Sequence, residues 1–228
     1  MVAQSEHSGR RLLAAAVFFG VVAALVLGEV VLRLLQPPQL SKIRYPCIYR
    51  PDPATGFRYE PGARGVVAGH FEIENEVVMN SLGFYDDEPL PDDRVGARIL
   101  AVGDSFTAAM NVPRSEVWTS VLEAELRRSG YPRADVVNIG IDGTGTDVHL
   151  ELLRRYVPRF EPDVVLVAFF ANEVVDVLPD MVRALERDGR TPADLFFVHD
   201  NHLNAYGNRL FGRAVARTLT ADREPGRR

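Results

Sequence analysis

Short apolar runs that alternate with helical patterns begin near Arg98, and this alternation constrains the fold more than any other feature. Four runs are nearly continuous: residues 99–102, 136–139, 164–170 and 195–198. Apolar runs of this length are typical of parallel strands that are buried on both faces. Helical patterns separate the first three runs, so the segment predicts βαβ units with right-handed crossovers. We therefore expect an α/β fold, a three-layer sandwich built on a short parallel sheet.

The helices of this segment are indicated by apolar spacing and by residues typical of helix ends. One pattern runs from a capping Ser115 to Gly130, and the next runs from a capping Thr146 to Pro158. A shorter helix is expected over residues 181–187. A closing helix over residues 205–219 would carry its apolar residues on one face.

The N-terminal region contains an apolar segment long enough to cross a bilayer. Residues 12–35 would form a helix of about 36 Å, with Glu29 and Arg33 one turn apart near its end. We expect a transmembrane signal anchor at residues 12–35 and a cytoplasmic stub at residues 1–11. A cleaved signal peptide is the alternative, because Val26 and Gly28 are small enough to precede a cleavage site. Basic residues flank the segment on both sides, so its orientation is weakly encoded.

The region between the apolar segment and Arg98 has a different character. Residues 36–97 are rich in proline, glycine and charge, with only short β-like stretches such as residues 69–78. We expect a linker and a small, partly β appendage there. The main domain would then occupy residues 98–220, followed by a disordered tail over residues 221–228.

Composition excludes several functional classes. The chain has 26 basic and 31 acidic residues, a net charge of −5, so nucleic acid is not an expected partner. Cys47 is the single cysteine, which excludes an intramolecular disulfide and any multi-cysteine metal site. His199, Asp200 and His202 lie close together, but third and fourth metal ligands are not evident. Glycine-rich nucleotide-binding motifs are absent from the sequence, so neither a metal nor an organic cofactor is expected.

Small or polar residues follow each of the four apolar runs. Ser105 follows the first run, the glycine-rich residues 140–145 follow the second, Asn172 follows the third, and Asp200 and His202 follow the fourth. The carboxyl ends of parallel strands meet at one edge of a sheet, so these groups should lie together. A hydroxyl, an imidazole, a carboxylate and several amide donors are the parts that an acyl-transfer site needs.

Two of these segments also resemble motifs of the SGNH (GDSL-type) hydrolase family. The stretch Gly103-Asp104-Ser105-Phe106 is similar to the block that carries the family's nucleophile. Gly143 stands five residues after Asn138, as the oxyanion glycine of the family does. By this resemblance Ser105 is the nucleophile, and the backbone amides of Ser105 and Gly143 are oxyanion donors.

The other two segments resemble the remaining blocks of the same family. Asn172 occupies the place of the Gly-x-Asn-Asp block, and the resemblance makes its side chain a third oxyanion donor. Asp200, His202 and Asn204 are similar to the Asp-x-His-x-Asn form of the membrane-anchored, polysaccharide-modifying branches. His202 would be the base and Asp200 its orienting carboxylate. The likeness covers residues 75–220, and the four blocks are specific only when taken together.

The resemblance implies an SGNH/flavodoxin-like fold, with the catalytic domain outside the cytoplasm. The implied activity is that of a serine esterase or O-acyltransferase acting on acyl esters, with esters of cell-envelope carbohydrates as the implied substrates. Water as acceptor gives an esterase, and a sugar hydroxyl gives a transferase. Only 30 residues separate Asn172 from His202, which is short for a complete βαβ unit. One sheet strand fewer is therefore expected, and a noncatalytic envelope protein that binds glycan or a protein partner is the alternative.

Overall fold

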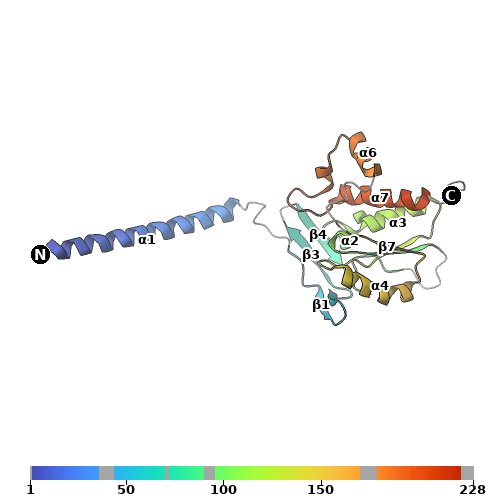
Figure 1. Cartoon of the computed structure of the whole chain (residues 1–228), viewed down its shortest axis with the longest axis horizontal. Coiled ribbons are helices and arrows are strands. Elements are labelled where there is room, and N and C mark those ends of the chain that lie inside the picture. Colours follow the sequence, from blue (N-terminus) through green and yellow to red (C-terminus); the bar gives the residue numbers. More distant parts are fainter. Residues whose placement is uncertain (1, 36–43, 70–71, 90–95, 170–178, 222–228) are drawn as a thin grey trace. The chain divides into compact units, whose positions relative to one another are not determined.

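The computed structural model describes residues 2–35, 44–69, 72–89, 96–169 and 179–221. The chain divides into two units, Met1–Lys42 and Ile43–Arg228. The first unit is the helix α1 (Val2–Leu35) (Figure 1). Its portion Ala14–Leu35 is 22 residues long and apolar enough to cross a membrane, a property that an N-terminal signal sequence shares. This apolar helix agrees with the expected anchor or signal sequence.

The second unit is built on a short parallel sheet, as predicted. Its strands are β5 (Arg98–Val102), β6 (Asp135–Asn138) and β7 (Val164–Val167), in the spatial order β6-β5-β7. In register, Ile99 of β5 pairs with Val136 on one side and with Val164 on the other. Every residue of the central strand β5 is buried, which explains its continuous apolar run.

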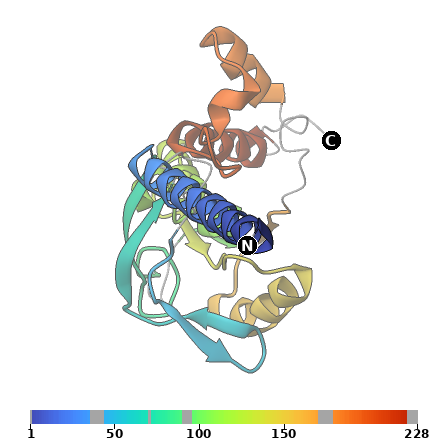
Figure 2. The same cartoon turned by 90° about the vertical axis from the view of Figure 1, so that its left-hand side faces the viewer.

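Helices cover both faces of this sheet. Helix α4 (Thr146–Phe160) lies on one face, and helices α3 (Trp118–Arg128) and α7 (Ala205–Ala221) lie together on the other (Figures 1 and 2). Ser115 is not the cap of α3, because it lies in the short 3-10 helix η2 (Arg114–Glu116). The first turn of α3 is held instead by α7, where the side-chain oxygen of Asn208 accepts a hydrogen bond from the backbone N–H of Trp118 at 3.2 Å.

The prediction of a fourth strand at residues 195–198 is wrong. After α6 (Pro179–Arg187) the chain forms the 3-10 helix η3 (Pro192–Leu195) and a single antiparallel bridge between Phe196 and Leu203. Thr191 bends the chain before η3, since its N–H donates to the carboxylate of Asp194 at 2.7 Å. Val198 is 83% exposed, so an apolar run at this point does not mark a buried strand.

The loss of that strand leaves β7 at the edge of the sheet within the described part of the chain. The prediction that residues 164–170 are buried on both faces is therefore wrong. Burial alternates along β7, with Val165 and Val167 each 39% exposed. Sequence periodicity alone does not separate an edge strand with such a composition from a central strand.

Two antiparallel hairpins precede the sheet. The first pairs β1 (Tyr49–Asp52) with β2 (Gly56–Tyr59), and the second pairs β3 (Arg64–Gly69) with β4 (Ile73–Val78). Asp52 ties the first hairpin to α4 by accepting hydrogen bonds from Arg155 at 3.0 and 3.2 Å, and this contact holds the pKa of Asp52 well below its usual range. Ile48, Tyr59 and Val67 belong to the same hydrophobic core as β5.

Candidate active site

Ser105 stands at a tight turn that follows the central strand. It is the first residue of the short helix α2 (Ser105–Ala108), and Asp104 caps this helix by accepting a hydrogen bond from the N–H of Phe106 at 3.0 Å. A Cβ atom on Gly140 would lie 2.5 Å from the backbone nitrogen of Ala108. Only glycine therefore lets the loop after β6 pack against the helix that carries Ser105.

Asn138 joins the end of β6 to the same turn. Its side-chain N–H₂ donates to the carbonyl of Thr107 at 2.7 Å, and its side-chain oxygen accepts from the N–H of Gly140 at 2.9 Å. Asn138 is buried. Its amide thus holds the loop that leads to Gly143 in place against α2.

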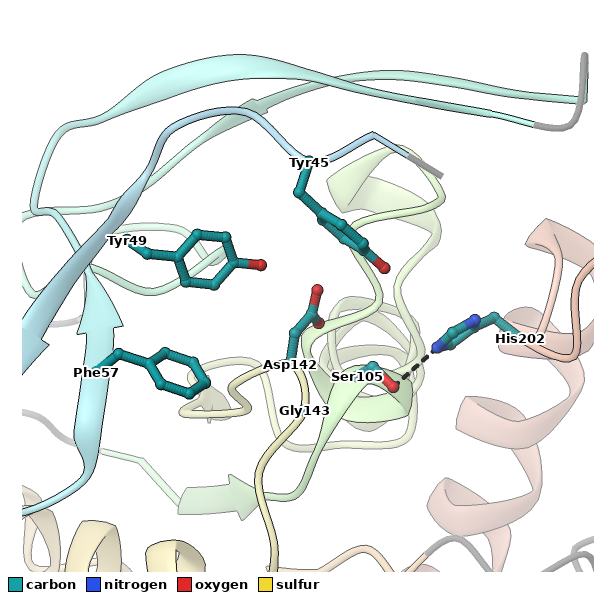
Figure 3. A pocket seen from close by; sticks show the side chains of 7 residues that line it. All are labelled: Tyr45, Tyr49, Phe57, Ser105, Asp142, Gly143 and His202. Carbon is teal, nitrogen blue, oxygen red and sulfur yellow. Dashed lines mark hydrogen bonds between the residues drawn. The ribbon is translucent and has the colours of Figure 1, made fainter. Parts of the chain in front are cut away.

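The structure brings Ser105, His202 and Asp200 into one hydrogen-bonded chain. His202 Nε2 lies 2.8 Å from Ser105 Oγ (Figure 3), and His202 Nδ1 lies 2.5 Å from Asp200 Oδ1. The same carboxylate oxygen accepts a second hydrogen bond from the backbone N–H of His202 at 2.8 Å. With an ionised Asp200, Nδ1 carries the proton, and Nε2 offers its lone pair to the Ser105 hydroxyl.

The imidazole is also held from its face and through its loop. The ring of Phe106 stacks on His202 with centroids 4.8 Å apart and an interplanar angle of 27°. Upstream in the loop, the carboxylate of Glu72 accepts hydrogen bonds from the backbone N–H groups of Val198 and His199 at 2.8 and 2.7 Å. Downstream, Asn204 donates to the carbonyl of Phe196 at 2.8 Å. These contacts fix the orientation of the ring before any ligand arrives.

A pocket of about 490 Å³ opens beside Ser105 (Figure 3). Its lining residues are Tyr45, Tyr49, Phe57, Ser105, Asp142, Gly143 and His202. Tyr45, Tyr49 and Phe57, which we call the aromatic wall, come from the region that the sequence indicated as linker and appendage. Nothing in the local sequence pattern points to them, because only long-range packing brings the first hairpin and the residues just before it to the pocket.

Asp142 is the group in this pocket that sequence reasoning missed. Its residue is only 8% exposed, and neither carboxylate oxygen has a hydrogen bond of normal length and angle within the described residues. Burial raises the pKa of Asp142 to about 6, although the nearby charge of His202 and the hydroxyl of Tyr59 favour the ionised form. The backbone N–H of Asp142 donates to the Tyr59 hydroxyl at 2.7 Å. The available signal was a charged residue directly before Gly143, in the block of residues 138–143.

The predicted oxyanion donors are placed only in part. Gly143 lines the pocket together with Ser105 and has φ of +67°, a conformation that favours glycine. Asn172 lies within residues 170–178, outside the described residues. Within the described ranges there is no group of three or more His, Cys, Asp or Glu side chains that could hold a metal ion.

Comparison with known proteins yields little. No family model matches the chain, and no curated protein matches it either. Among solved structures, a crystal structure of TesA matches with 25% sequence identity and a TM-score of 0.31, covering 53% of this chain and 54% of that chain. The chain thus spans about half the length of this protein. A TM-score this low does not establish a shared function.

Proposed function

We propose that this protein is a serine hydrolase or O-acyltransferase of the SGNH type that acts on acyl esters. The observation that carries the proposal is the chain of short contacts from Ser105 Oγ through His202 to Asp200, at 2.8 and 2.5 Å. A serine hydroxyl is a weak nucleophile at neutral pH, and an imidazole that is oriented by a carboxylate is the usual means of activating it.

The reaction follows from these three groups. His202 Nε2 takes the hydroxyl proton while Ser105 Oγ forms a bond to the ester carbonyl carbon, and Asp200 stabilises the imidazolium that results. The backbone amides of Ser105 and Gly143, with the side chain of Asn172, would stabilise the oxyanion. His202 then returns its proton to the alcohol oxygen as the C–O bond breaks. Water or a second alcohol attacks the acyl-enzyme by the reverse steps and regenerates Ser105.

Two features favour catalysis over a noncatalytic binding role. The short segment before His202 does not keep the imidazole away from Ser105, because the two side chains are in hydrogen-bond contact. The pocket beside them is large enough for a small ester and includes both reacting side chains. A protein that only binds a ligand has no need for an imidazole ordered by a carboxylate on one side and aimed at a hydroxyl on the other.

The location and the substrate are proposed with the same reaction. The helix over residues 12–35 would anchor the protein in the membrane, and the domain at residues 98–220, together with residues 36–97, would act outside the cytoplasm. Esters of cell-envelope carbohydrates are the proposed acyl carriers. Neither a nucleic acid nor a cofactor has a part in this reaction.

The test uses the full-length chain in detergent micelles. A fluorophosphonate probe should label Ser105 and only Ser105, and p-nitrophenyl acetate should be hydrolysed. The Ser105→Ala variant should lose both the label and the turnover. Folded protein that shows neither labelling of Ser105 nor turnover would refute the proposal.

A further inference from the structure

One side of the pocket contains groups that the proposed reaction does not use. Ser105 and His202 lie on one side, and Asp142 lies between them and the aromatic wall (Figure 3). The carboxylate of Asp142 takes no part in activating Ser105, because Asp200 already occupies Nδ1 of His202. Its place beside the nucleophile nevertheless puts it within reach of whatever is attached to the ester.

Asp142 is a buried anion that lacks the usual compensation. The residue is 8% exposed, and no lysine or arginine lines the pocket. The nearby donors are the hydroxyls of Tyr45, Tyr49 and Tyr59, and none of them makes a hydrogen bond of normal length and angle to the Asp142 carboxylate. Burying an unpartnered carboxylate is unfavourable, and native proteins rarely retain one without a use. An ionised carboxylate accepts hydrogen bonds and cannot donate them. A ligand group that binds the Asp142 carboxylate must therefore be a hydrogen-bond donor.

The aromatic wall restricts the choice of donor. The hydroxyl ends of Tyr45 and Tyr49 point into the pocket near Asp142 (Figure 3), and Tyr49 packs edge to face against Phe57 with ring centroids 5.6 Å apart. A quaternary ammonium is bound by the faces of several rings. Here the polar ends of two rings and a carboxylate gather around one position. This arrangement suits hydroxyl groups on a carbon skeleton, whose C–H bonds can lie against the rings.

We propose that Asp142, Tyr45 and Tyr49 form the subsite for the alcohol part of the ester, and that they select an alcohol with further hydroxyl groups beside the esterified oxygen. Glycerol and sugar residues share this chemistry. The inference rests on the proposed esterase or transferase activity and specifies its substrate class. Asp142 accepts hydrogen bonds from the free hydroxyls, and the Tyr45 and Tyr49 hydroxyls complete the set.

The test compares acetate esters that differ only in the alcohol. Ethyl acetate has no further hydroxyl, glycerol monoacetate and glucose monoacetate have several, and acetylcholine has a cation without a donor. The readout is the ratio of kcat/KM for each ester to kcat/KM for ethyl acetate, measured on the full-length chain in detergent. Any effect of a substitution on Ser105 or His202 cancels in this ratio, because every ester uses both residues.

Asp142→Asn should lower the ratio for glycerol monoacetate by about tenfold to a hundredfold, the usual loss of a hydrogen bond to a charged group. Tyr49→Phe keeps the ring and should lower the same ratio by a smaller factor. Asp188→Asn removes an exposed carboxylate that accepts from Tyr206 outside the pocket, and it is the matched control with an unchanged ratio. A higher ratio for glycerol monoacetate would identify a glycerol-type alcohol, and a higher ratio for glucose monoacetate would identify a sugar. Both outcomes support the subsite.

Three results would overturn the inference. Equal ratios in the parent chain and in both pocket variants would show that the alcohol does not use these groups. A preference for acetylcholine that Asp142→Asn abolishes would identify a cation site. Absence of turnover on every ester together with an unlabelled Ser105 would refute the proposed function itself, whereas a labelled Ser105 with active hydrolysis of ethyl acetate confines the failure to the subsite.

Discussion

Two carboxylates near Ser105 differ in their hydrogen bonding: Asp142 lines the pocket, and Asp200 lies behind His202. Asp200 accepts hydrogen bonds from His202 Nδ1 at 2.5 Å and from the His202 backbone N–H at 2.8 Å. The Asp200 side chain is 10% exposed, and Asp142 is 8% exposed with no such partner for either oxygen among the described residues. This difference shows which part of the site has its hydrogen bonds already formed in the absence of substrate. The side with the proposed triad is organised in advance, and the side next to the aromatic wall lacks a donor that a ligand can supply.

The first way to sharpen this comparison is to remove the nucleophile. Ser105→Ala should lower kcat for p-nitrophenyl acetate by about a millionfold, because the remaining groups cannot form the acyl-enzyme. Adding His202→Ala should cause almost no further loss, since the two residues act as a unit. Steady-state kinetics on the single and double variants measures both effects. A further large loss in the double variant would contradict the arrangement.

The second substitution addresses the carboxylate that is already paired. Asp200→Asn should lower kcat by about ten thousandfold, because an amide can no longer hold the tautomer that presents the Nε2 lone pair to Ser105. Fluorophosphonate labelling of Ser105 should slow in parallel. Asp194→Asn offers a control in the same segment, since the Asp194 carboxylate accepts hydrogen bonds from Thr191 in the neighbouring turn and has no contact with His202 among the described residues. A near-normal kcat in Asp200→Asn would move the orienting role to another residue.

The third prediction concerns the unpaired carboxylate and the pH dependence of stability. Burial raises the pKa of Asp142 from 3.8 to about 6. At a pH between these two values, the Asp142 carboxyl is protonated in the folded chain and ionised in the unfolded chain. The stability that comes from this proton is present below about pH 4 and is lost as the pH rises through about 6. The free energy of unfolding of Asp142→Asn should therefore rise relative to the parent by about 3 kcal/mol between about pH 4 and about pH 7.

This third effect is measured by denaturant unfolding of both proteins in detergent at the two pH values. Asp188→Asn is the control in this measurement, because it removes an exposed carboxylate that lies outside the pocket. A pH-independent difference between Asp142→Asn and the parent would mean that water reaches the Asp142 carboxylate freely. That result would also remove the contrast with Asp200.

The smallest expected effect is on the backbone at Gly143. Gly143→Ala should lower the free energy of unfolding by about 1 kcal/mol, because φ of +67° is unfavourable for alanine. A Cβ atom there would meet no atom within 4 Å, so steric overlap does not add to the loss in the free energy of unfolding. Gly130→Ala is the matched control, with φ of +97° and equally open surroundings. Both variants should lose stability, and only Gly143→Ala should also lower kcat.

Most of the sheet and its helices could be predicted from the sequence, because local periodicity determines them. The central strand is buried at every position and the helices α3 and α4 show clear apolar faces. The run at residues 195–198 misled the prediction because capping by Thr191 and the bonds of Asn204 turn the chain there. These are polar contacts at specific positions, and an apolar run does not reveal them.

In the site, too, some residues are predicted by local sequence motifs and others are brought together only by tertiary packing. Ser105, Asp200 and His202 are predicted from their resemblance to family motifs and from their place after apolar runs. The structure places their side chains in contact, although the strand predicted before Asp200 does not form. Tyr45 and Tyr49 could not be predicted, because only long-range packing brings the first hairpin and the residues just before it to the pocket. Asp142 stood within a motif already singled out, beside Gly143. The motif indicates a backbone donor at Gly143, and the burial of the Asp142 side chain depends on tertiary packing that the motif does not reveal.

The aromatic wall has an evolutionary consequence. Tyr49 and Phe57 belong to a hairpin, whereas Ser105 follows a strand of the parallel sheet. Mutations of pocket-lining residues in the hairpin can therefore change which ligands the pocket admits without altering the proposed catalytic residues. We therefore expect sequence variation among related proteins to be greater along residues 45–57 than around Ser105. Such proteins would differ in the esters that they accept and share the proposed reactive centre.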